Sequence, residues 1–380
     1  MSAILRRFSL LLLLFFTTAV SANLAFVPAP PGVKAEGYVL QDFHSGRILA
    51  SVNENERMEP ASLTKMMTAY VVFQELASGD IKLDDKVRIS EKAWRTQGSR
   101  MFVEVDTKVT LEQLLKGVII QSGNDASVAV AEYVAGSEEA FAALMNEYAR
   151  KLGLTDTNFV NSTGLPHPEH YTTPRDMALL ATGVIHDFPQ FYEWYSIKEY
   201  TYNNITQHNR NKLLWRDEYV DGVKTGHTDS AGYCLVSSAK REDMRLVAVV
   251  MGTSGENARA QESQKLLNFG FRFFETHRLY ESDTPLKEIR IWKGMSETLP
   301  LGLNREMYVT IPRGQYEQLD ASLSVDSNII APAHKGQEFG TVTVQLGEEV
   351  LVEQPLVALQ DIEEGGLWQR LLDDVMLWFY

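Results

Sequence analysis

The hydrophobic pattern of this 380-residue chain changes near His277, and that change limits the folds available to it. Before this point, long segments repeat apolar residues every three or four positions, as helices with one buried face do. After it, short runs such as 307–312 (MYVTIP) and 340–346 (GTVTVQL) alternate apolar and polar residues between turns. The sequence therefore predicts a domain with several helices over residues 27–277, followed by a small all-β domain over residues 278–362.

The first domain is expected to mix strands with helices. Residues 37–53 (GYVLQDFHSGRILASVN) predict two strands joined by a turn, and residues 232–240 and 245–253 predict two more around a charged turn. Helical spacing of apolar residues predicts helices over 62–76, 110–122, 126–136, 137–154 and 258–277. The fold class that follows is α+β.

The first 22 residues have the three parts of a signal peptide. Arg6 and Arg7 form a positive region, residues 8–20 an apolar region, and Ala22 ends a small-residue cleavage site. The apolar run is short for a membrane span, so we expect export and cleavage; an uncleaved anchor is the alternative.

The charge and the cysteine and histidine content exclude several functions. A net charge of −14 repels phosphate backbones, so nucleic acid is not an expected partner. Cys234 is the only cysteine, and we expect it to be a packed strand thiol, with no disulfide framework. The eight histidines lack the paired spacing of metal ligands, and His167 and His170 are expected in a loop. No metal or cofactor is predicted.

Ser62 and Lys65, in the stretch PASLTKMMTAY, are the first candidates for catalysis. A serine hydroxyl is a poor nucleophile until a neighbour removes its proton, and residues three apart share a helix face. Lysine removes that proton only as a neutral amine, a form that burial or a second cation favours. The same spacing recurs at Ser237 and Lys240, and Ser62 could simply cap a helix, so this pair alone does not identify a site.

Two further motifs follow along the chain. Ser122 and Asn124 lie in the break between two predicted helices, and Lys224, Thr225 and Gly226 lead into a predicted strand. Ser-x-Asn is common by chance, whereas Lys-Thr-Gly occurs once, against a chance expectation of about one in ten for this composition. The three motifs together supply a nucleophile, a base, a second cation and a hydroxyl for proton return.

The motifs resemble those of penicillin-recognising serine enzymes, and most closely the low-molecular-mass penicillin-binding proteins, which are D-alanyl-D-alanine carboxypeptidases of bacterial cell walls. The resemblance covers nearly the whole chain, including residues 44–49, 220–235 and 262–276. It implies a transpeptidase-like domain, with an antiparallel sheet flanked by helices, before the small all-β domain. It also implies that the ligands are peptidoglycan stem peptides and β-lactam antibiotics, and that the protein works at the periplasmic face of the inner membrane.

The resemblance assigns three catalytic roles. Ser62 attacks the carbonyl between two terminal D-alanines and forms an acyl-enzyme, while Lys65 takes its proton. Ser122 then returns a proton to the departing D-alanine.

The resemblance also implies substrate-binding residues. Lys224 is expected to lower the pKa of Lys65, and Thr225 and Arg259 to hold the terminal carboxylate, although a surface helix arginine is the alternative for Arg259. Backbone N–H groups of Ser62 and His227 would form the oxyanion hole. The full set is Asn124 (for the peptide stem), Lys224, Thr225, Gly226 (for close approach of the strand), His227, Arg259 and Arg210.

Residues 366–380 predict an amphipathic helix. Apolar side chains fall on one face and polar ones, including Asp373 and Asp374, on the other. The helix is too short to span a bilayer, so we expect it to lie at the membrane surface, as the resemblance also implies; a helix docked on the protein is the alternative.

Three other functions compete with this interpretation. A class A β-lactamase uses the same acylation but needs a glutamate about forty residues after the second motif, and residues 155–168 contain none. A transpeptidase or endopeptidase would share the acyl-enzyme, whereas a non-catalytic cell-wall scaffold would use only the β domain and tail.

Two departures from the family pattern bear on the site: Thr163 stands where relatives often have histidine, and segment 90–102 is shortened.

Overall fold

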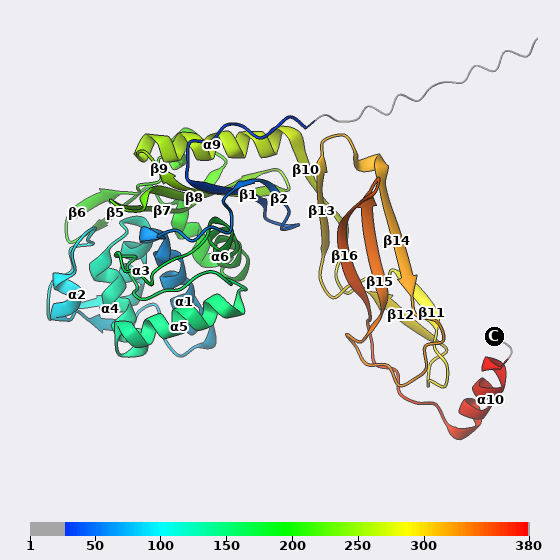
Figure 1. Cartoon of the computed structure of the whole chain (residues 1–380). Helices are drawn as coiled ribbons and strands as arrows, with labels where there is room; N and C mark the ends of the chain where they lie inside the picture. Colours follow the sequence, from blue (N-terminus) through cyan, green and yellow to red (C-terminus); the bar gives the residue numbers. More distant parts are fainter. Residues whose placement is uncertain (1–26, 379–380) are drawn as a thin grey trace, which may run out of the picture.

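The computed structural model describes residues 27–378 (Figure 1). The signal peptide expected over residues 1–22 lies outside the described residues. The chain forms a larger part of helices and strands and an elongated all-β part, joined where α9 runs into β10. This arrangement confirms the α+β class with a trailing all-β domain, while the exact domain bounds remain a prediction.

An antiparallel five-stranded sheet lies at the centre of the larger part, in the order β2-β1-β9-β8-β7. The predicted N-terminal hairpin, β1 and β2, pairs with the late strand β9, so the two ends of this part meet in one sheet. The strands are β1 (Gly37–Asp42), β2 (Ile48–Val52), β7 (Val220–Thr228), β8 (Gly232–Arg241) and β9 (Met244–Thr253).

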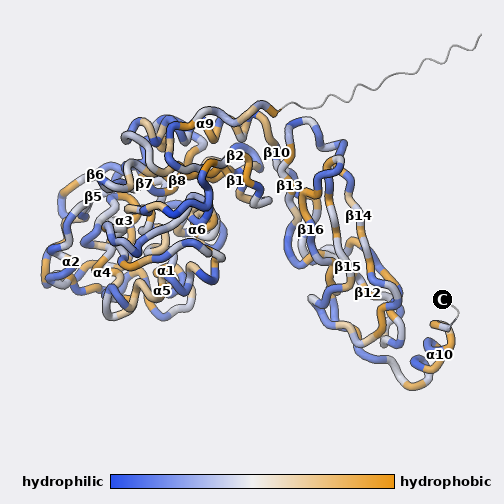
Figure 2. Tube along the Cα trace, in the orientation of Figure 1, coloured by the Kyte–Doolittle hydropathy of each residue, from blue (hydrophilic) through white to orange (hydrophobic). Residues whose placement is uncertain are grey.

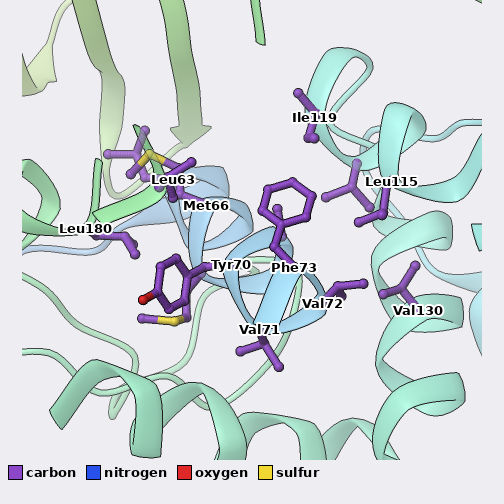
Figure 3. Close-up of a cluster of buried hydrophobic side chains, with 14 of the residues drawn as sticks. Leu63, Met66, Tyr70, Val71, Val72, Phe73, Leu115, Ile119, Val130 and Leu180 are labelled. Carbon is purple, nitrogen blue, oxygen red and sulfur yellow. The ribbon is translucent and has the colours of Figure 1, made fainter. Parts of the chain in front are cut away.

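Helices cover both faces of this sheet (Figure 1). One face carries α9 (Glu256–Phe273), and the other carries a helical layer around α1 (Lys65–Ser78), which is buried from Lys65 to Phe73. Figure 3 shows Phe73 of α1 close to Leu115 and Ile119 of α3. The other helices of the layer are α3 (Leu111–Ile120), α4 (Asn124–Ala135), α5 (Glu138–Lys151) and α6 (Pro174–Asp187). The apolar segments run through the interior of this part in Figure 2.

The helix α6 had not been predicted from the sequence, and neither had several short elements. The short elements lie between the longer ones along the chain, and local sequence signals for them are weak because each has only three to five residues. They are β3 (Lys86–Arg88), α2 (Glu91–Arg95), β4 (Lys108–Thr110), α7 (Pro189–Tyr192), η2 (Glu193–Ser196), β5 (Glu199–Tyr202), β6 (Ile205–His208) and α8 (Leu213–Arg216).

The all-β part is built on a second five-stranded antiparallel sheet, in the order β11-β12-β16-β15-β14. Its core includes Leu299, Val342 and Leu356. The strands are β11 (Lys287–Arg290), β12 (Thr298–Gly302), β14 (Leu319–Val325), β15 (Glu338–Leu346) and β16 (Glu349–Ala358), with the short turn η3 (Tyr316–Gln318) before β14. A two-stranded ribbon of β10 (Phe274–Tyr280) and β13 (Met307–Pro312) joins this sheet to the larger part.

The helix α10 (Leu367–Leu377) follows at the far end of the all-β part (Figure 1). Within residues 27–378, no helix has both the length and the apolar character needed to cross a lipid bilayer.

Candidate active site

Ser62 and Lys65 lie where a short 3-10 turn, η1 (Ala61–Thr64), passes into α1. The two functional atoms, Lys65 Nζ and Ser62 Oγ, are 3.0 Å apart. The turn packs against β7 so closely that a Cβ on Gly226 would lie 3.0 Å from the Pro60 carbonyl oxygen, which explains why a glycine follows Lys224 and Thr225. The structure thus brings the first and third motifs into contact.

The Lys65 side chain is only 1 % exposed and makes three polar contacts. Besides Ser62, Nζ donates to Asn124 Oδ1 at 2.7 Å and to the backbone carbonyl of Thr163 at 2.5 Å. A neutral amine has two N–H donors and one lone pair. The two carbonyl-type oxygens therefore account for both donors of a neutral Lys65, which leaves its lone pair directed at the Ser62 hydroxyl.

Burial lowers the pKa of Lys65 to about 7, and the positive charge of Arg210 adds to this effect. The negative charges of Asp125 and Glu138 raise the pKa of Lys65 and so oppose this effect. Lys65 and Lys224 also repel each other when both are charged, and the pKa of Lys224 is lowered well below its usual value by burial and then by Lys65. Arg210, to which the sequence gave no defined role, is thus one of the cations that favour the neutral form of the base.

The second motif lies at the start of α4. Ser122 Oγ accepts a hydrogen bond from Lys224 Nζ at 2.9 Å, and both residues are buried. Ser122 has a left-handed backbone, with φ of 59°, a conformation that non-glycine residues adopt mainly where the surroundings enforce it. The Asn124 amide is held at both ends, because its Nδ2 donates to the Gln97 carbonyl at 2.6 Å.

These contacts surround a cavity of about 390 Å³. The predicted residues that line it are Ser62, Ser122, Asn124, Arg210, Thr225, Gly226, His227 and Arg259. Lys65 and Lys224 lie behind the lining and reach it through Ser62 and Ser122. Every site residue named from the sequence therefore lies at one place, although their individual roles remain predictions.

One end of the cavity is positively charged. Arg259 projects from α9, is only 3 % exposed, and donates to the Gly226 carbonyl at 3.1 Å, so the alternative of a surface arginine is wrong. Burial lowers the pKa of this guanidinium. Arg210 lies nearby, while Glu256 at the same end pairs with Lys212 at 2.9 Å. Such an end is suited to a carboxylate.

The His227 side chain lies at the exposed mouth of the cavity. Its ring packs against Tyr233, with 3.9 Å between the ring centroids.

Cys234, the neighbour of Tyr233 on β8, is buried as expected, and burial raises the pKa of its thiol to about 11.

Several residues that line the cavity have no function that could be assigned from the sequence. Gly98 and Ser99, from segment 90–102, and Thr163, Gly164 and Leu165 all line the cavity. The turn at 161–165 is closed by Asn161, whose Oδ1 accepts from the Thr163 and Gly164 N–H groups at 3.1 and 2.7 Å. An Asn-x-x-Gly turn is recognisable in a sequence, but its position beside Lys65 is not.

A Ser-Lys pair, a Ser-x-Asn turn and a Lys-Thr-Gly strand around one pocket define a penicillin-recognising serine enzyme. Comparison with known proteins is more specific. The profile of the D-alanyl-D-alanine carboxypeptidase family matches residues 24–255, and that of the C-terminal domain of penicillin-binding protein 5 matches residues 274–364. The chain therefore belongs to the D-alanyl-D-alanine carboxypeptidase family, and it is a serine-type carboxypeptidase, a hydrolase.

Individual relatives match this chain over most of its length. The chain is 46 % identical to the D-alanyl-D-alanine carboxypeptidase DacC of Escherichia coli (strain K12), over 98 % of this chain and 94 % of the relative. It is 43 % identical to DacA of the same organism, over 93 % and 90 %. Among solved structures, penicillin binding protein 5 from Haemophilus influenzae matches with a TM-score of 0.85 and 42 % identity, over 89 % of this chain and 100 % of that one.

Proposed function

We propose that the protein removes the terminal D-alanine from peptidoglycan stem pentapeptides through an acyl-enzyme on Ser62, and that penicillins acylate the same serine. The observation that carries this proposal is the buried amine of Lys65, 3.0 Å from the Ser62 hydroxyl and held by two carbonyl oxygens. The positive end of the cavity supports a substrate that ends in a carboxylate.

Acylation starts with neutral Lys65. Its lone pair takes the proton from Ser62 as Oγ attacks the carbonyl carbon between the two D-alanines. The substrate's carboxylate is held by Thr225 and Arg259 at the positive end. Backbone N–H groups of Ser62 and His227 stabilise the oxyanion, and the loss of one such donor typically costs about 3 kcal/mol.

Collapse of the tetrahedral intermediate breaks the peptide bond and needs a proton on the departing nitrogen. Ser122 Oγ provides it and regains a proton from the two buried amines, of which Lys224 is 2.9 Å away, so that the proton Lys65 took from Ser62 is the one passed on and Lys65 is neutral again. Water then attacks the acyl-enzyme and gives a proton to the amine of Lys65. As the ester bond to Ser62 breaks, Lys65 passes this proton to Ser62 Oγ, and the shortened peptide leaves with a new terminal carboxyl group.

A carboxypeptidase is favoured over a β-lactamase by the residues around the cavity. Among the described lining residues, Glu256 is the one acid, and it is paired with Lys212 at the positive end. No lining carboxylate is therefore placed to activate a water against a penicillin-derived acyl group, as the class A mechanism requires. We expect slow release of that group; turnover of penicillin at many molecules per second would favour the β-lactamase.

The direct test is D-alanine release from a synthetic stem pentapeptide by the purified protein. Ser62→Ala should abolish release. The matched control is Ser237→Ala, in the second Ser-x-x-Lys stretch, because Ser237 is buried in β8 and does not line the cavity. This control should keep wild-type activity. Undiminished release by Ser62→Ala would contradict the proposal, and a scaffold would show no release in any variant.

We also propose that the protein is exported and attaches to the periplasmic face of the inner membrane through α10. The apolar face of this helix is open to solvent, with Trp368 82 % and Leu371 58 % exposed. The polar face is turned toward the protein: Asp373 accepts from the Lys293 N–H at 2.5 Å, and Asp374 pairs with the Lys293 side chain. The two aspartates, unusual on a membrane helix, thus have partners within the chain.

A further inference from the structure

His170 connects two segments that meet behind the active site. Its ring is only 2 % exposed; Nε2 lies 2.8 Å from Thr64 Oγ1, and Nδ1 accepts from the Val160 N–H at 3.3 Å. Because Nδ1 is an acceptor, the proton of the neutral ring is on Nε2, which donates to Thr64. Burial supports this form, since it lowers the pKa of His170 to about 4, with smaller contributions from His167 and Lys65.

Both partners of His170 adjoin groups that hold Lys65. Thr64 immediately precedes Lys65, and Val160 leads into the turn whose Thr163 carbonyl lies 2.5 Å from Lys65 Nζ. One helical turn beyond Thr64, the Thr68 hydroxyl donates to the Ser162 carbonyl at 2.7 Å. The turn and the start of α1 are therefore joined by polar contacts on both sides of Lys65.

The two segments approach each other closely. A Cβ on Gly164 would lie 1.8 Å from the Ala61 carbonyl oxygen and 2.9 Å from Thr64 Oγ1. A small displacement between the segments would thus alter the distance from the Thr163 carbonyl to the Lys65 amine. Misplacement by about 1 Å can reduce a rate a hundredfold.

We propose that His170 is a positioning residue for the general base: by joining Thr64 to the segment at Val160, its neutral ring keeps the Thr163 carbonyl on Lys65 and the lone pair of Lys65 on Ser62. This inference rests on the proposed function of Lys65. His170 does not line the cavity. Its loss should therefore slow the chemical step and leave substrate binding unchanged.

The test compares variants at both ends of the Thr64 contact. His170→Asn can keep an acceptor near Val160, but its shorter amide does not reach the Nε2 position that donates to Thr64. Thr64→Val loses the hydroxyl with little change in volume. Each should lower kcat for D-alanine release roughly tenfold to a hundredfold, with KM within about twofold of wild type. Thr64→Ser keeps the hydroxyl and should retain most of the wild-type activity.

The double variant gives a second readout. Both substitutions break the same hydrogen bond, between His170 and Thr64. The double variant His170→Asn with Thr64→Val should therefore have a kcat no lower than that of the slower single variant. The control is His167→Gln, in the same loop but exposed, which should behave as wild type.

Three results would overturn the inference: an unchanged kcat in His170→Asn, a loss confined to KM, or equal impairment of Thr64→Ser and Thr64→Val. If the wild-type protein released no D-alanine, the proposed function itself would fail instead. The comparison of Thr64→Ser with Thr64→Val also separates positioning from a packing defect, because Thr64→Val keeps the volume without the hydroxyl, whereas Thr64→Ser keeps the hydroxyl without the methyl group.

Discussion

At the scale of single residues, the protonation state of Lys65 decides whether Ser62 can react. Burial lowers the pKa of this amine from 10.5 to about 7. The amine is charged below that pH and neutral above it, so kcat/KM should rise as pH increases through about 7 and level off afterwards. The pH profile of D-alanine release measures this directly. An acidic limb near the ordinary lysine pKa would show that Lys65 is not the neutral base.

Arg210 should affect the pH at which the acidic limb of this profile lies. Its positive charge disfavours the ammonium form of Lys65, so Arg210→Gln should raise the pKa of Lys65 and shift the acidic limb to higher pH. The variant should also raise KM, since Arg210 lines the positive end of the cavity. Arg216→Gln, which removes a nearby but exposed arginine outside the lining, is the control and should leave the limb in place. Identical limbs in both variants would contradict the electrostatic role.

The side-chain motifs were predictable from the sequence, whereas the backbone carbonyl that holds Lys65 was not. Ser62, Lys65, Ser122 and Lys224 carry their chemistry in their side chains, so order and spacing were enough to name them. The Thr163 carbonyl acts through an atom that every residue has, and no sequence pattern marks it. His170 looked like an ordinary loop residue because the burial that gives it partners comes from tertiary packing.

At the scale of elements, α10 should bind membranes through its apolar face. Each leucine that enters the interface contributes about 1.5 to 3 kcal/mol when fully buried, so Leu371→Gln with Val375→Gln should weaken binding to anionic lipid vesicles at least roughly tenfold. Release of D-alanine from a soluble peptide should not change, because the cavity lies in the larger part, whereas α10 lies at the far end of the all-β part (Figure 1). Vesicle co-sedimentation measures the first quantity.

The matched control for α10 is Leu323→Gln, which changes an exposed leucine of β14. Its vesicle binding should equal that of wild type. Equal binding of all three proteins would contradict attachment through α10.

The end of α9 shows where element prediction failed. Apolar spacing predicted a helix through His277, but the helix ends at Phe273 and β10 begins at Phe274. Phe274 pairs with Pro312 and His277 with Val309, so a partner strand about thirty residues away along the chain determines the boundary. Local spacing carries no information about such a partner.

At the scale of the whole molecule, polar contacts join the two parts beside the β10–β13 ribbon. Arg47 of the first hairpin donates to the Thr310 carbonyl at 2.8 Å and pairs with Glu349 at 2.7 Å. Thr276 of β10 donates to the buried Asp42 at 2.6 Å. The change of pattern predicted two parts, but not these contacts, because they depend on side chains that local patterns leave unconstrained.

The account as a whole requires that folding gathers three separate motifs so that one serine becomes a nucleophile. Mass spectrometry of the protein after exposure to a penicillin tests this most directly. We predict one added penicilloyl group, located on the proteolytic fragment that contains Ser62, and none in the Lys65→Ala variant over the same time. An adduct on another residue, or a Lys65→Ala variant acylated as fast as wild type, would contradict the account.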